Sequence, residues 1–202
     1  MNVEQGSPEW FEARQGRMTA SHAQAIGNAG KGLETYIVQI MAEVYSSGDN
    51  EKPFFNSHTD RGNELEPIAR AVYEMETGNA VHEVGFIEYG DYAGCSPDGL
   101  VGDEGGIEIK SIDNVGYFKH ILNGQKEVDS KHEWQVQMNL LVTGRKWWDL
   151  VLYNPNYKKS MFVYRYGRNE AMREALIEGI EIGAAAIGRI TKKMQENGFD
   201  KA

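Results

Sequence analysis

The sequence contains a single cysteine and no long hydrophobic run. Cys95 alone can form neither an intrachain disulfide nor a cysteine-based metal cluster, so both kinds of crosslink are excluded within one chain. No apolar run approaches the roughly 20 residues that span a bilayer. The N-terminal segment also lacks the basic and apolar regions of a signal peptide. We therefore expect a cytoplasmic protein with no membrane association.

An excess of positive charge is also missing, because 30 acidic residues outnumber 21 basic ones. Proteins that bind nucleic acid non-specifically are usually basic, so the overall charge argues against a simple DNA-binding protein. A metal-dependent nuclease remains compatible, since bound cations reverse the local charge of the carboxylates that it needs. The basic residues that cluster, and that weakly favour a DNA groove, are Arg145, Lys146, Lys158, Lys159, Arg165 and Arg168.

Two carboxylates stand ten positions apart around a glycine-rich segment at 102–106. Beyond that segment, Glu108 and Lys110 alternate with isoleucines, which predicts a half-buried strand with both charged side chains on one face. The glycine-rich segment is long enough to turn the chain and bring Asp98 back beside them. Two hard oxygen ligands next to an ammonium group suit a divalent cation that activates water. The alternative is an ordinary Asp-Gly turn beside a solvated Glu–Lys ion pair.

The remaining pattern predicts one domain over residues 1–202, an α/β fold with a central mixed β-sheet flanked by helices. Ser7 and Pro8 mark the start of a short first helix that stops by residue 16. Thr19 or Ser21 is expected to cap a second helix toward Ile26. Apolar residues at helical spacing predict further helices over 33–44, 65–75, 134–142 and 172–194. Strands are expected at 81–89, 93–101, 107–112, 147–153 and 161–166.

Pro97-Asp98 followed by Glu108-x-Lys110 resembles the signature of the PD-(D/E)XK nuclease superfamily. Further segments resemble the phage lambda exonuclease family of viral recombination 5′–3′ exonucleases, over roughly residues 10–155. These segments are Trp10-x-x-x-Arg14-x-Gly16-x-x-Thr19-Ala20-Ser21, Arg61-Gly62-x-x-x-Glu66 and Gln135-Val136-Gln137. The resemblance implies a restriction-endonuclease-like nuclease core.

The resemblance also implies a binding pocket for the 5′-terminal phosphate of DNA, made by Arg14, Ser21 and Ser96. An arginine fork and two hydroxyls match the oxygens of a phosphate group. Each residue also has a structural interpretation: Arg14 as a solvated or ion-paired side chain, Ser21 as a helix cap, and Ser96 as a turn residue.

The catalytic set expected from the motifs is Asp98, Glu108, Lys110, Gln135 and Glu66. Asp98, Glu108 and the Ile109 carbonyl would hold Mg²⁺, with two ions in all and Mn²⁺ as a substitute. Lys110 would orient or help deprotonate the attacking water. Gln135 would hold that water or the lysine, unless it only forms a polar helix face.

Glu66 is expected to bind a metal directly or through water. Glu64 competes for this acidic role, and the spacing of the motif favours Glu66. The five histidines, among them His132 three residues before Gln135, show no metal-binding spacing.

The predicted function is Mg²⁺-dependent 5′–3′ hydrolysis of one strand of linear double-stranded DNA to mononucleotides, which leaves 3′ single strands for recombination. The resemblance further implies a ring-shaped homotrimer around DNA ends and a single-strand annealing protein as partner. Two alternatives remain open. One is an endonuclease of the same superfamily, of the restriction or junction-cleaving type, and the other is a non-catalytic DNA-associated protein.

Overall fold

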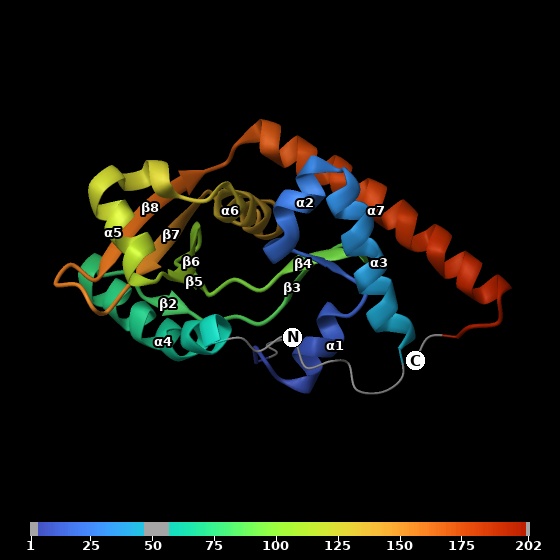
Figure 1. Ribbon diagram of the computed structural model, residues 1–202, viewed down its shortest axis with the longest axis horizontal. Coiled ribbons are helices and arrows are strands. Elements are labelled where there is room, and N and C mark those ends of the chain that lie inside the picture. Colours follow the sequence, from blue (N-terminus) through green and yellow to red (C-terminus); the bar gives the residue numbers. More distant parts are fainter. Residues whose placement is uncertain (1–3, 47–56, 201–202) are drawn as a thin grey trace.

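The computed structural model describes residues 4–46 and 57–200 (Figure 1). Its helices and strands, in chain order, are α1 (Pro8–Arg14), β1 (Met18–Thr19), the 3-10 turn η1 (Ala20–His22), α2 (Ala23–Asn28), α3 (Lys31–Tyr45), α4 (Ser57–Thr77), β2 (Val81–His82), β3 (Ile87–Tyr89), β4 (Ala93–Cys95), β5 (Gly99–Val101), β6 (Gly105–Ser111), α5 (Asn114–Asn123), the 3-10 turn η2 (Gly124–Glu127), α6 (Ser130–Thr143), β7 (Trp147–Tyr153), β8 (Met161–Gly167) and α7 (Glu170–Glu196).

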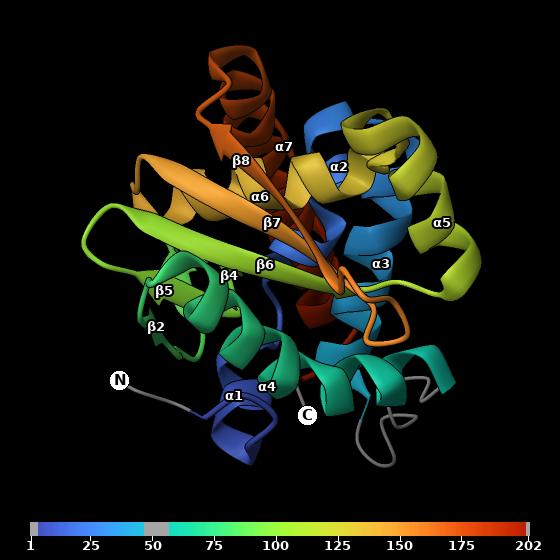
Figure 2. The same ribbon diagram turned by 90° about the vertical axis from the view of Figure 1, so that its left-hand side faces the viewer.

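A mixed five-stranded sheet, in the order β2-β5-β6-β7-β8, forms the first layer of the molecule. Its central strand β6 runs antiparallel to β5 and parallel to β7. Figure 2 shows α4 on one side of this sheet and α6 on the other. Ile107 and Ile109 of β6 pack toward α4 with Tyr73, while Leu150 of β7 packs with Val136 of α6. Both faces of the sheet are therefore covered.

A second, three-stranded sheet in the order β1-β4-β3 lies against α2, α3, α6 and α7. The longest helix, α7, runs across α2 and α3 (Figure 1). Gly179 permits the close contact between α7 and α2, because a Cβ there would stand 2.0 Å from the carbonyl oxygen of Ile26. This packing holds α2, the helix that follows Ser21, against α7.

The β5–β6 hairpin sets the relative position of the two motif carboxylates. Gly99 pairs with Ile107 and Val101 pairs with Gly105. Continuing this antiparallel register by one residue places Asp98 opposite Glu108, where cross-strand side chains are close neighbours. The hairpin predicted from the glycine-rich segment is thus confirmed.

The predicted fold class, a mixed sheet flanked by helices, is confirmed, and four details differ. The segments 81–89 and 93–101 each split into two short strands, and each pair divides between the two sheets. Neither Thr19 nor Ser21 caps α2, which begins after His22 without a side-chain cap. The helix α5 was not predicted at all. The helix expected over 33–44 is α3, which ends at Tyr45.

The fourth difference concerns β6, which was predicted to be half-buried. Five of its seven residues are buried, including Glu108. The physical reason is that α6 covers the face that carries the charged side chains, and polar groups of α6 take the place of solvent. Among the described helices, none is long and apolar enough to cross a membrane.

Candidate active site

Three acidic side chains near the open end of the β5–β6 hairpin, Asp98, Glu108 and Glu66, are close enough for their charges to interact. Asp98 ends the bend before β5 and accepts a 2.6 Å hydrogen bond from the backbone N–H of Ile109. Burial, together with the negative charges of Glu108 and Glu66, raises the pKa of Asp98 well above its usual value. Burial and the charge of Glu108 likewise raise the pKa of Glu66, although Arg70 opposes the shift. The carboxylates that share this space repel one another, and such a cluster favours a bound cation.

Glu108 is only 2% exposed and is held by three side-chain donors. Its Oε1 accepts from Lys110 Nζ at 2.8 Å and from Gln135 Nε2 at 2.6 Å. Its Oε2 accepts from Asn139 Nδ2 at 3.0 Å. Gln135 and Asn139 lie one turn apart on α6, so they present their amides to the same place. A buried carboxylate requires such partners because its desolvation is otherwise very costly.

Lys110 is the cation that pairs with Glu108. Burial alone would lower its pKa, but the charges of Glu108 and Asp98 and the bond to Glu108 outweigh burial and raise the pKa. Lys110 therefore stands in the site as an ammonium donor. Glu66 accepts a 2.7 Å bond from Arg70, which also pairs with Glu83.

The donor set fits a magnesium-type ion. In the described part of the chain, no three histidine, cysteine or acidic side chains form a group that could hold a metal ion. Mg²⁺ does not need three such ligands, because it usually takes one or two carboxylates and completes its shell with water and substrate phosphate oxygens. Asp98 and Glu108 could supply two such carboxylates, and a cation between them would relieve their mutual repulsion. Glu64 is exposed, whereas the charge of Glu66 acts on Asp98 and Lys110.

A second polar group, made by Ser96, Arg14 and Trp10, lies next to the acidic cluster. Ser96 stands two residues before Asp98 in the chain. Ser96 Oγ accepts from Arg14 Nη1 at 3.0 Å and from Trp10 Nε1 at 2.9 Å. The guanidinium of Arg14 stacks over the Trp10 ring at 4.1 Å. Burial lowers the pKa of Arg14, which nevertheless remains charged, as arginine does in proteins. Two of the three predicted phosphate ligands are therefore in direct contact.

Ser21, the third, belongs to a neighbouring hydroxyl cluster. Its Oγ lies 3.1 Å from Thr19 Oγ1 and 3.2 Å from His22 Nδ1, and the His22 ring stacks on Tyr36 at 3.9 Å. Parallel pairing of Thr19 with Gly94 puts Ser21 and Ser96 each two residues past the last paired position. The charge of Arg14 also lowers the pKa of His22, after burial, which is the main cause. The structure thus places Ser21 on the same edge as Ser96 but shows no hydrogen bond between them.

The clustered basic residues have mainly structural contacts. Arg145 Nη1 donates to the carbonyl oxygens of Val101, Gly102 and Gly105, and so clamps the β5–β6 hairpin. Arg165 forms a two-pronged ion pair with the buried Asp149. The remaining contacts are Lys146 with Glu104, Arg168 with the Gly144 carbonyl, and Lys159 over the Phe162 ring. Most of the predicted basic groove is therefore engaged within the protein.

Three participants were missed from the sequence. Asn139 could have been found from its four-residue spacing to Gln135. Trp10 was part of a recognised motif but had no assigned role. His132 lies one turn before Gln135, and its Nδ1 is buried without a hydrogen-bond partner among the described residues. Burial and the charge of Lys110 lower the pKa of His132 to about 4. Arg61 lies in the part of α4 where side chains are not described.

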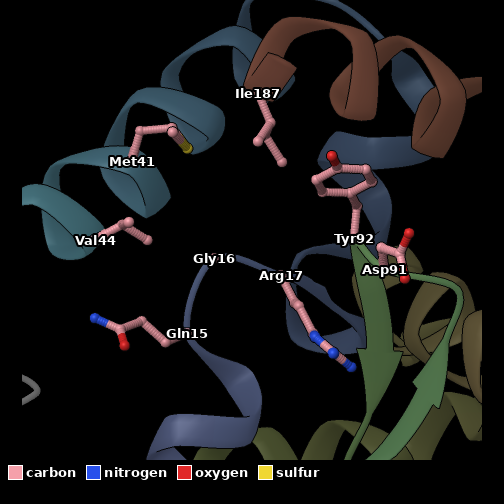
Figure 3. A pocket seen from close by; sticks show the side chains of 8 residues that line it. All are labelled: Gln15, Gly16, Arg17, Met41, Val44, Asp91, Tyr92 and Ile187. Carbon is pink, nitrogen blue, oxygen red and sulfur yellow. The ribbon is translucent and has the colours of Figure 1, made fainter. Parts of the chain in front are cut away.

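A cavity of about 280 Å³ opens elsewhere, between the α1–β1 turn, α3 and α7 (Figure 3). Met41, Val44, Tyr92 and Ile187 give it an apolar wall, and Gln15 stands at its side. None of the predicted site residues lines it. The cavity is therefore separate from the acidic cluster.

Comparison with known proteins places this geometry among nucleases. A family model described as the YqaJ-like viral recombinase domain matches residues 9–146. Two solved structures of an alkaline exonuclease from Laribacter hongkongensis, one in complex with dAMP, are each 30% identical to the chain. Their TM-scores are 0.85 and 0.84, and each match covers 95% of this chain and 98% of the other.

A phage related exonuclease from Haemophilus somnus 129PT has the same fold, with a TM-score of 0.67 and 13% identity. That match covers 88% of this chain and 96% of the other. A search of curated proteins gives no significant match.

Proposed function

This chain belongs to the family of YqaJ-like viral recombinase domains, and we propose that it is a Mg²⁺-dependent exonuclease that degrades one strand of linear double-stranded DNA from its 5′ end. It releases mononucleotides and leaves a 3′ single strand for recombination. The similar enzyme from Laribacter hongkongensis is an alkaline exonuclease, and one of its structures contains dAMP, a mononucleotide. We also propose that residues 1–202 form a single nuclease domain.

The observation that carries the proposal is the connection between the acidic cluster and the Arg14–Ser96 group. Ser96 and Asp98 are two residues apart, so their Cα atoms are separated by at most about 7 Å. That span is comparable to one nucleotide of a DNA strand. A terminal phosphate on Arg14 and Ser96 would therefore put the next phosphodiester at the acidic cluster. An exonuclease that removes one nucleotide at a time from the 5′ end requires this geometry.

Arg14 supports an anion site in two ways. In the described part of the chain its partners are a hydroxyl and aromatic rings, with no carboxylate in ion-pair contact. A largely desolvated guanidinium without a paired anion favours binding of a phosphate, which it can contact with two N–H groups. Ser96 already accepts two hydrogen bonds, so its own O–H is left to donate outward. Arg14 and Ser96 thus offer donors to the same ligand, and Ser21 would add a third from the same edge of the sheet.

The residues of the acidic cluster fit hydrolysis of the phosphodiester. Asp98, Glu108 and the Ile109 carbonyl would hold Mg²⁺, with a second ion on Asp98 and Mn²⁺ as a substitute. The chemistry that such ions supply is Lewis-acid activation of water and phosphate. Lys110, as an ammonium, orients the water and offsets charge that builds on the phosphoryl oxygens. Gln135 holds Glu108 through its 2.6 Å hydrogen bond, and Glu66 would bind a metal ion directly or through water.

An assay with linear and circular DNA tests the function. Wild-type protein with Mg²⁺ should degrade a linear 5′-phosphorylated duplex, leave a covalently closed circle intact, and do nothing in the presence of a chelator. A label on the 5′-terminal nucleotide should appear in mononucleotides before a label at the 3′ end is released. Cleavage of the circle would instead establish the endonuclease alternative, and early release of the 3′ label would reverse the polarity. The control is Asp98→Ala, which should be inactive on every substrate.

The trimer and the annealing protein are proposals that rest on the family resemblance. Val115, Phe118 and Leu122 on α5 have exposed apolar side chains, which supports a protein–protein contact at this helix. Sedimentation equilibrium of the purified protein should give the mass of three chains. A mass of one chain at micromolar concentration would contradict the ring.

A further inference from the structure

Asn139 is a fully buried polar residue in the middle of α6. Its neighbours Met138 and Leu140 are also buried and belong to the apolar core. Only one end of its amide is satisfied: Nδ2 donates to Glu108 Oε2, while Oδ1 has no hydrogen-bond partner among the described residues. A half-satisfied buried amide costs stability relative to an apolar side chain of similar size. Packing alone therefore does not explain an asparagine at this position.

The hydrogen bonds of Glu108 divide unequally between its two oxygens. A carboxylate offers about four acceptor positions, two on each oxygen. Lys110 and Gln135 occupy both positions of Oε1. Asn139 is the one described donor to Oε2, which leaves a single acceptor position on that oxygen. The open position of Glu108 is therefore on the oxygen that Asn139 holds.

We propose that Asn139 is a positioning residue that fixes the orientation of Glu108 and presents the remaining lone pair of Oε2 to the metal ion. This inference rests on the proposed function, because it assigns Glu108 as a metal ligand. Asn139 makes no contact with the metal or the DNA in this role. Because its amide is neutral, it orients the carboxylate without cancelling the charge that attracts the cation.

Gln135 and Asn139 should differ in their effects. Loss of the Gln135 amide leaves Oε1 bound to Lys110, so the carboxylate keeps one partner on that oxygen. Loss of the Asn139 amide leaves Oε2 without any described donor, so that oxygen is no longer fixed, although Oε1 keeps its bonds to Lys110 and Gln135. Groups that orient a metal ligand typically change metal affinity by about 10–100-fold when they are removed. The same range is expected for Asn139.

The test is binding of Mn²⁺ or Mg²⁺ to DNA-free protein, measured by isothermal titration calorimetry and by the spin resonance of free Mn²⁺. Asn139→Leu keeps the volume and removes the donor, and its affinity should fall about 10–100-fold. Asn139→Ala serves as the second variant if the leucine side chain prevents folding, with the same expected loss. Asn139→Ser restores a hydroxyl donor and should recover part of the affinity.

Gln137→Leu is the matched control, because Gln137 is an equally buried amide on α6 that bonds to the Gly167 carbonyl and not to Glu108. Its metal affinity should equal that of wild type at temperatures below unfolding. Glu108→Gln separates the two levels of inference. If Glu108→Gln binds the metal as tightly as wild type does, or if wild type binds no metal, the metal site of the proposed function is overturned and this inference with it. Binding that is lost in Glu108→Gln but unchanged in folded Asn139→Leu or Asn139→Ala overturns the role of Asn139 alone.

Discussion

Replacement of Arg14 by alanine should remove the preference for 5′-phosphorylated DNA ends while the acidic cluster stays intact. The guanidinium of Arg14 donates to Ser96 Oγ and stacks on Trp10, and neither contact involves a carboxylate of the acidic cluster. A hydrogen bond between charged groups contributes about 1.5–3 kcal/mol. Since about 1.4 kcal/mol corresponds to a factor of ten, the preference should fall about 10–100-fold.

The assay compares initial rates on two linear duplexes that differ only in a 5′-phosphate or a 5′-hydroxyl group. Wild type should degrade the phosphorylated duplex faster, and the ratio of the two rates should approach one in Arg14→Ala. Arg14→Lys keeps the charge but loses the planar fork, so its ratio should lie between the other two.

Arg17→Ala is the matched control. Arg17 lies three residues further along, pairs with Glu88 at 2.6 Å and lines the separate cavity of Figure 3. Its removal should leave the rate ratio unchanged. Thermal unfolding of each variant shows whether the stack on Trp10 is also needed for stability. Equal rates of wild type on both duplexes, or an undiminished ratio in folded Arg14→Ala, would refute the phosphate pocket.

Three further predictions concern the cluster, the hairpin and acid stability. Asp98→Ala, Glu108→Ala and Lys110→Ala should each abolish hydrolysis in a folded protein, as judged by circular dichroism, and near-normal turnover of any one would contradict its role. Arg145→Met should lower the free energy of unfolding by about 2 kcal/mol in urea titrations, because three hairpin carbonyls lose a charged donor. His132 resists protonation until about pH 4 in the folded protein but takes a proton near 6.5 when unfolded, so acid favours unfolding. Wild type should therefore lose up to about 3 kcal/mol more than His132→Gln between pH 6.5 and 4, and parallel curves would show that the imidazole titrates normally.

The sequence was sufficient for the features that depend on local patterns. Alternation around Glu108 predicted β6, and the glycine-rich segment predicted the hairpin that returns Asp98 to its side. Apolar periodicity located α3, α6 and α7. In each case the pattern lies within one segment, so no knowledge of its packing partner is required.

The errors arise where a distant segment decides the outcome. The segment 93–101 has continuous strand character, but Ser96 and Asp98 interrupt it where the chain leaves one sheet for the other. The burial of Glu108 depends on α6, more than twenty residues further along the chain, which covers its face of β6. α5 carries several exposed apolar residues, so its periodicity does not mark one buried face. Arg145 likewise donates its hydrogen bonds to carbonyl groups some forty residues earlier, so its structural role could not be read from its own segment.

The chemistry of the donors around Glu108 indicates why a buried carboxylate can still serve as a metal ligand. An arginine on α6 would satisfy the carboxylate equally well, but its charge would compete with a cation for the same oxygen. The amides of Gln135 and Asn139 supply two of the three hydrogen bonds to Glu108 and add no positive charge. Lys110 supplies the third, and Arg70 is the cation bonded to Glu66. Burial and repulsion from Glu108 and Glu66 raise the pKa of Asp98, and a divalent cation would relieve that repulsion. The repulsion that contributes to this shift is therefore also what favours the metal ion that we propose for the cluster.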